Sequence, residues 1–85
     1  MKITQTPYID HSDLNRVWLD TEVPFQSVRL EMNGWTEEKD TGASGTRIEL
    51  RVPRVKAESL LHVTAFDDAG KRYAASALLR PVKVK

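Results

Sequence analysis

The feature that most constrains this fold is an apolar/polar alternation on either side of a short turn, within residues 60–79. Residues 61–66 (LHVTAF) alternate with a period of two and include β-branched side chains, which predicts a strand. Residues 67–70 (DDAG) follow; aspartate side chains there can accept bonds from backbone N–H groups, and glycine tolerates positive φ. The alternation then resumes, so the segment predicts a β-hairpin.

A helix is the competing prediction for residues 71–80. Alanine and leucine are strong helix formers, and Tyr73, Ala74, Ala77 and Leu78 would form a narrow apolar stripe at helical spacing. Short apolar runs are ambiguous by period alone. The tight turn before this segment, together with Pro81 and the valine/lysine alternation after it, favours a strand.

Strands are predicted in most of the remaining chain by the same alternation, at residues 2–8, 14–20, 25–33 and 46–52. The Asn33-Gly34 dipeptide predicts a tight turn. The polar stretch 35–45 is predicted to be the longest loop, and residues 56–58 a single helical turn. This pattern predicts an all-β sandwich of six to seven antiparallel strands. The alternative is a small five-stranded barrel of the oligonucleotide-binding (OB) type, with one short helix near residues 55–61.

Two segments resemble bacterial immunoglobulin-like domains, a class related to fibronectin type III domains. Residues 63–70 (VTAFDDAG) are similar to the V-x-A-x-D-x-A-G pattern of their strand F and the following turn, and residues 28–34 (VRLEMNG) to the V-x-V-x-V-N-G pattern of their strand C. The chain has Ser59 where related fibronectin-like domains often place an aromatic at the start of strand F, and Lys71 where asparagine usually follows the turn glycine. The resemblance, limited to about 28–34 and 61–70, implies a single immunoglobulin-like domain over residues 1–85.

Charge and length set further limits on function. The 85 residues include 13 basic and 12 acidic side chains, a net charge of +1, so no global field of one sign favours nucleic acid. No cysteine is present, and no run approaches the length of a membrane span, so we expect no membrane insertion. The first residues lack the apolar core of a signal peptide. A complete chain would therefore be cytoplasmic or part of a virion, whereas an excised module would come from a secreted or cell-surface protein.

Catalytic and metal-binding patterns are weak. Asp10, His11 and Asp13 form one local cluster, but it has too few ligands for zinc and lacks the spacing of a calcium loop. No G-x-S-x-G motif occurs, and residues 42–46 lack the Gly-Lys-Ser/Thr of a phosphate loop. The acids of the 35–45 segment are expected to be solvated, which does not favour acid catalysis. We therefore expect no enzyme activity, no cofactor and no metal.

A binding role is the remaining expectation. The resemblance implies a non-catalytic interaction or structural module, such as an accessory or spacer domain of a bacterial surface protein or carbohydrate-active enzyme, or a phage virion component. Its partner would be a protein or glycan, met by the 35–45 loop and one sheet face, and the module would be a monomer or part of a larger chain or assembly. The candidate contact residues are Trp35, Glu37, Glu38 and Asp40.

Two alternatives accompany this hypothesis. Trp35 would either contact the partner or cover the open end of the sandwich. The chain would otherwise be a small nucleic-acid-binding or inhibitory protein, if Arg47, Arg51 and Arg72 share a basic face. Few aromatic residues lie among the basic ones, and single-strand binders depend on stacking, so nucleic acid is the less favoured partner.

Overall fold

The fold is seen in a computed structural model, which describes residues 1–6, 8–9, 14–41 and 46–84. These residues contain strands and turns but no helix. In chain order the strands are β1 Lys2–Gln5, β2 Tyr8–Ile9, β3 Leu14–Asp20, β4 Ser27–Met32, β5 Trp35–Asp40, β6 Arg47–Pro53, β7 Ser59–Phe66, β8 Arg72–Leu79 and β9 Lys83–Val84.

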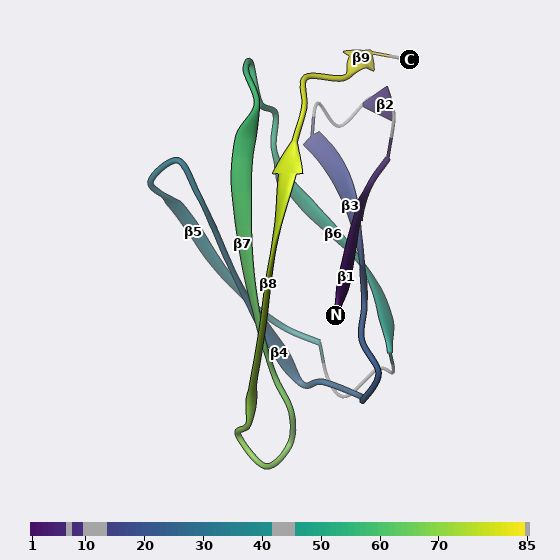
Figure 1. The fold of residues 1–85 in the computed structure, drawn as a ribbon, viewed down its shortest axis with the longest axis vertical. Helices are drawn as coiled ribbons and strands as arrows, with labels where there is room; N and C mark the ends of the chain where they lie inside the picture. Colours follow the sequence, from purple (N-terminus) through teal and green to yellow (C-terminus); the bar gives the residue numbers. More distant parts are fainter. Residues whose placement is uncertain (7, 10–13, 42–45, 85) are drawn as a thin grey trace.

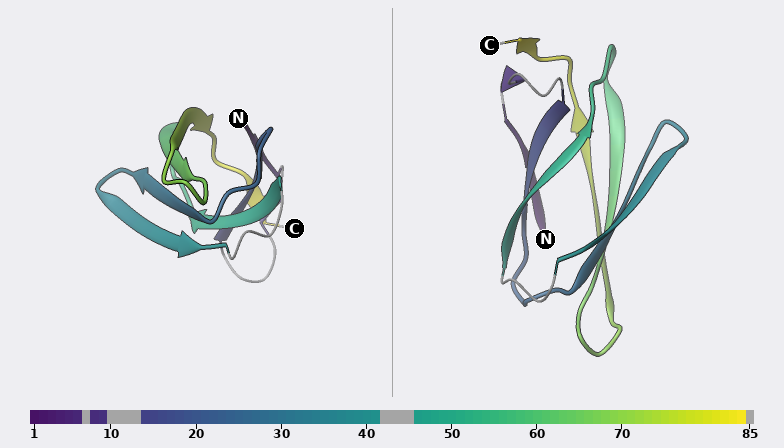
Figure 2. Two further views of the ribbon diagram at one scale, coloured as in Figure 1. Left: turned by 90° about the horizontal axis from the view of Figure 1, so that it is seen from below. Right: turned by 180° about the vertical axis from the view of Figure 1, so that it is seen from behind.

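Seven of these strands form two antiparallel sheets that pack as two layers (Figures 1 and 2). One sheet has the order β1-β3-β6 and the other β5-β4-β7-β8, while β2 and β9 form a short parallel pair. The prediction of an all-β, two-sheet sandwich is therefore confirmed. The barrel alternative is wrong, because the strands divide between two sheets and residues 54–58 form a loop rather than a helix.

The core lies between the two sheets and is built from alternate residues of each strand. In β3, β4 and β7 every second side chain is buried, as expected for strands with one face on a core. Phe25 is also buried, although it precedes β4. The buried apolar side chains are Val17, Leu19, Phe25, Val28, Leu30, Met32, Leu50, Val52, Val55, Leu61, Val63, Ala65 and Leu79.

The β4–β5 turn is the tight hairpin that Asn33-Gly34 predicted. Asn33 has φ 50° and Gly34 φ 80°, the two positive values that a type I′ turn requires. The Asn33 side-chain amide donates to Ser59 Oγ at 2.9 Å, and the Ser59 hydroxyl donates to the Ala57 carbonyl at 3.0 Å. These bonds tie the hairpin to the start of β7, so Ser59 has a structural role.

The β7–β8 turn is organised by one carboxylate. Asp67 Oδ1 accepts hydrogen bonds from the backbone N–H groups of Ala69 at 3.0 Å and Lys71 at 2.8 Å. Gly70 has φ 81°, and its N–H donates to the Asp67 carbonyl at 3.1 Å. The chain therefore reverses directly into β8, and the prediction of a strand rather than a helix in residues 71–80 is confirmed.

Two local predictions are wrong. Residues 35–40, which were expected to begin a long loop, form strand β5 and pair with all of β4. The Asn33-Gly34 turn explains this, because a two-residue turn returns the chain directly alongside β4 whatever its charge. The helical turn expected at residues 56–58 is absent, and the segment bends into β7.

Candidate functional site

The candidate site is the exposed side of the β5-β4-β7-β8 sheet, which faces away from the core and is called the outer face below. The strand registers arrange its side chains in rows that cross the sheet. From β5 to β8 the rows are Asp40–Ser27–Phe66–Arg72, Glu38–Arg29–Thr64–Ala74, Thr36–Glu31–His62–Ser76 and, on β7 and β8 alone, Leu60–Leu78.

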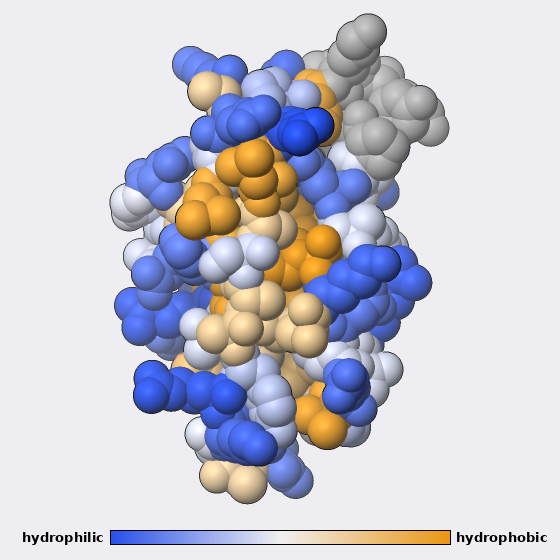
Figure 3. Space-filling model, viewed as in Figure 1, coloured by the Kyte–Doolittle hydropathy of each residue, from blue (hydrophilic) through white to orange (hydrophobic). Residues whose placement is uncertain are grey.

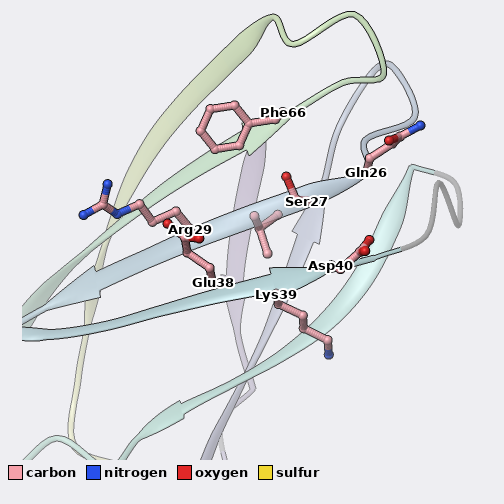
Figure 4. A pocket seen from close by; sticks show the side chains of 8 residues that line it. Gln26, Ser27, Arg29, Glu38, Lys39, Asp40 and Phe66 are labelled. Atoms are coloured by element: carbon pink, nitrogen blue, oxygen red, sulfur yellow. The ribbon is translucent and has the colours of Figure 1, made fainter.

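A shallow groove of about 590 Å³ crosses the first of these rows. Ser27 has a small side chain and lies between Phe66 and Asp40, which leaves a hollow over β4. In Figure 4, Phe66 lies on one side of Ser27, with Glu38 and Asp40 on the other. The groove thus combines an aromatic ring with amide, guanidinium and carboxylate groups; its lining residues are Gln26, Ser27, Val28, Arg29, Glu38, Lys39, Asp40 and Phe66.

The β4–β5 half of the outer face is charged. Arg29 Nε lies 3.0 Å from Glu31 Oε1, and both side chains are about half exposed, at 47% and 49%. Glu38 is directly opposite Arg29 on β5. Exposed ion pairs add little to stability, so this half is a solvent-exposed charged surface whose ion pair contributes little to folding.

The β7–β8 half combines polar side chains with one exposed apolar pair. Leu60 and Leu78 pair across these strands and are 47% and 49% exposed; they are the exposed large hydrophobic residues of the described chain. Figure 3 shows apolar side chains gathered in a strip along the upper part of β8. Two adjacent leucines left in water are unfavourable unless another surface covers them.

His62 and Ser76 form the one side-chain pair on this face with a catalytic residue combination. His62 Nδ1 lies 2.9 Å from Ser76 Oγ, and both residues are exposed. A serine nucleophile also requires oxyanion donors and a third group that orients the histidine. Glu31 occupies the same row, but its carboxylate is held by Arg29. The geometry is that of a cross-strand hydrogen bond on an open sheet surface.

The four predicted contact residues lie on two sides of β5. Trp35 is half-buried and packs against the core, which fits the alternative that it covers the end of the sandwich. Glu37 lies on the side that faces β6, where it lines a hollow with Leu50 and Arg51. Glu38 and Asp40 lie on the outer face.

Sequence reasoning missed Phe66, Leu60 and Leu78. The available signal was that both leucines fall out of phase with the buried positions of their strands.

The basic residues do not form the shared face that the nucleic-acid alternative requires. Arg47 and Arg51 lie on β6, whereas Arg72 lies on β8 in the other sheet. Arg47 stacks 4.5 Å above the Trp18 ring and pairs with Asp20 at 3.6 Å. Arg51 lies 3.7 Å from Glu49. Acidic neighbours thus offset the positive charge of β6.

The described residues contain neither a cluster of metal ligands nor a membrane-spanning helix. Within the described ranges no three residues among His, Cys, Asp and Glu converge as a metal site would need. The cluster of Asp10, His11 and Asp13 lies outside the described residues. No described helix is long and apolar enough to cross a membrane.

Comparisons with protein-family models, with curated proteins and with solved structures found no match for this chain.

Proposed function

We propose that this chain is a non-catalytic binding module of the immunoglobulin-like, fibronectin type III-like class, and that its outer face binds another protein. The observation that carries the proposal is the exposed Leu60–Leu78 pair beside a charged strip on one face of the sheet. Protein interfaces typically combine apolar side chains with polar ones around them. The setting that we propose is a spacer or accessory domain of a bacterial surface protein or carbohydrate-active enzyme, or a phage virion component.

The strand order supports the class. Residues 28–34 and 61–70, which resemble strands C and F, contribute to β4 and β7. These two strands are neighbours at the centre of the four-stranded sheet, as C and F are in immunoglobulin-like sandwiches. The division of seven strands into sheets of three and four also agrees with this class.

The test is to change both leucines to aspartate (Leu60→Asp with Leu78→Asp) and to compare proteins captured from a host lysate by the full chain. A matched control, Thr4→Asp with Thr46→Asp, makes the same change of net charge at exposed positions in β1 and directly before β6, in the other sheet. We expect a captured protein that the leucine variant loses and the control retains. Equal capture by both variants would contradict the proposal.

Glycan binding is a second candidate, favoured by the groove beside Phe66. Aromatic rings and carboxylate or amide groups together can contact the apolar faces and the hydroxyls of a sugar. A glycan array followed by NMR titration would test it. We expect shifts at Phe66, Gln26 and Asp40 that Phe66→Ala abolishes; shifts confined to Leu60 and Leu78 would exclude the groove as the site.

A further inference from the structure

The four-stranded sheet ends in two edges of different character. β5 and β8 are its outermost strands, so each pairs with a neighbour on one side only. Unpaired edges offer backbone N–H and C=O groups to another strand, and natural proteins generally block them. Whether these two edges are blocked decides what they would bind.

The β8 edge is open over most of its length. Asp67 N–H donates to the Lys71 carbonyl at 3.1 Å, so Asp67 and Lys71 are a hydrogen-bonded pair, and this shows which other pairs of β7 and β8 are hydrogen-bonded. Because hydrogen-bonded pairs alternate in antiparallel strands, the backbone groups directed away from β7 belong to Arg72, Ala74, Ser76 and Leu78. In the described structure these groups receive no bond from any other element.

The next outward position of this edge is capped. The Gln5 side chain donates to the Arg80 carbonyl at 2.8 Å and accepts from the Arg80 N–H at 3.0 Å. One amide thus imitates the two bonds of a neighbouring strand. The cap stops at Arg80, so the open edge runs from Arg72 to Leu78.

On the β5 edge, as on the β8 edge, the outward backbone groups belong to residues whose side chains lie on the outer face. Thr41 N–H donates to the Gln26 carbonyl at 2.6 Å, so the hydrogen-bonded pairs of the β4–β5 ladder include Met32 with Trp35 and every second pair after it. The outward backbone groups of β5 therefore belong to Thr36, Glu38 and Asp40. Their side chains lie on the outer face, as do those of the outward residues of β8.

The positions of the outward backbone groups on β5 and β8 allow the sheets of two molecules to join into one continuous sheet. Residues that pair directly must have their side chains on the same face, and the outward positions of both edges satisfy this condition. Strands alternate in direction across β5-β4-β7-β8, so β5 and β8 run in opposite directions. A second copy placed in the same orientation would add its β5 antiparallel to β8, which continues the pattern of the sheet.

Charge favours pairing between unlike edges. β5 carries Glu37, Glu38 and Asp40 against one lysine, whereas β8 begins with Arg72 and contains no acidic residue. Two β5 edges would bring acidic residues together, and two antiparallel β8 edges would bring each Arg72 close to the other copy's Arg80. An antiparallel β8–β5 pair instead places Arg72 beside Glu38 or Asp40.

We propose that copies of this chain associate head to tail, with the β8 edge of one copy paired to the β5 edge of the next. This assembly uses the sheet edges rather than the outer face, so it goes beyond the proposed function. Because the two edges differ, the contact is heterologous and can extend to further copies. A contact between two short strands buries little surface, so we expect weak, concentration-dependent association.

The test uses proline to block one edge at a time. Proline lacks an N–H, and at an outward position of an edge strand it leaves the internal ladder intact. Ala74→Pro would block β8 and Thr36→Pro would block β5; Ala74→Ser and Thr36→Ser are the matched controls. Sedimentation velocity over a range of concentrations should show association for the unchanged chain and both serine controls, and monomers for each proline variant alone.

Mixing the two proline variants gives the decisive result. Each retains the edge that the other lacks, so we expect the mixture to form one-to-one dimers that do not grow further. Self-association of Thr36→Pro alone would indicate β8–β8 pairing and overturn the proposal. A monomeric unchanged chain at all concentrations, or a mixture that stays monomeric, would also overturn it.

A second pair of variants covers the case in which a proline variant fails to fold, which circular dichroism would show. R72E and E38R each place like charges across the proposed contact, so each alone should associate more weakly than the unchanged chain. Their mixture restores opposite charges and should regain association. If mixing brings no recovery, the β8–β5 contact is wrong.

Discussion

Gly34 has a backbone conformation that residues with a Cβ rarely adopt. Its φ of 80° lies in the left-handed region, and a Cβ at this position would meet no atom within 4 Å. The cost of a substitution is therefore conformational rather than steric crowding by neighbours. We predict that Gly34→Ala lowers the free energy of unfolding by about 1 kcal/mol, measured by urea denaturation.

Gly34→Asn is the matched control for this prediction, because asparagine adopts the left-handed region more readily than alanine. It should cost less than Gly34→Ala. Equal losses for the two variants would mean that positive φ at this position is not what the turn requires.

At the residue scale the sequence predicts buried positions well and exposed apolar ones poorly. Val17 and Leu19 lie on one face of a strand whose limits, residues 14–20, were predicted exactly as observed, and both are fully buried. Leu60 and Leu78 carry the same chemical signature as core residues. What separates them is the alternation along each strand, in which Leu60 and Leu78 fall out of phase with the buried positions, while the pairing of β7 with β8 places the two side by side.

The β7–β8 hairpin depends on a single side chain at its turn. The Asp67 carboxylate accepts two backbone N–H bonds, while Asp68 is exposed. Removal of the carboxylate leaves those N–H groups without their partner. We predict that Asp67→Ala lowers the free energy of unfolding by about 1–2 kcal/mol. Asp68→Ala, in the same turn and with the same change of charge, should alter it by less than about 0.5 kcal/mol.

Thermal and urea denaturation of both variants would measure this difference. A similar loss for the two variants would show that the turn responds to net charge rather than to the Asp67 hydrogen bonds.

Elements with an apolar side were predictable, and β5 was not. The segment 35–40 has one apolar residue and four charged ones, so its composition indicates a loop. It is a strand because the Asn33-Gly34 turn and the paired edge of β4 impose that conformation. The predicted candidate site was wrong for the same reason, because the residues expected to form a binding loop belong to an edge strand. The groove at Phe66 depends on three strands meeting, which no local pattern records.

In the whole molecule, β7 directs one row of side chains into the core between the two sheets and the other row to the outer face. Leu60 and Leu61 are adjacent leucines, yet Leu61 is fully buried and Leu60 is 47% exposed. Leu61→Ala removes packing from a core shared by both sheets, so we predict a loss of about 2–5 kcal/mol in the free energy of unfolding. Small domains are stable by only about 5–15 kcal/mol, so this variant should be partly unfolded in mild denaturant.

Leu60→Ala, the control, removes the same atoms from the outer face and should cost less than about 1 kcal/mol. The two variants would be compared by urea denaturation, and their partner binding measured under conditions in which both remain folded. Leu60→Ala should weaken binding through the outer face, whereas Leu61→Ala should leave the affinity of the folded fraction unchanged. A larger loss of stability for Leu60→Ala than for Leu61→Ala would mean that Leu60 packs in the core, and would contradict the assignment of Leu61 to the core and Leu60 to the outer face.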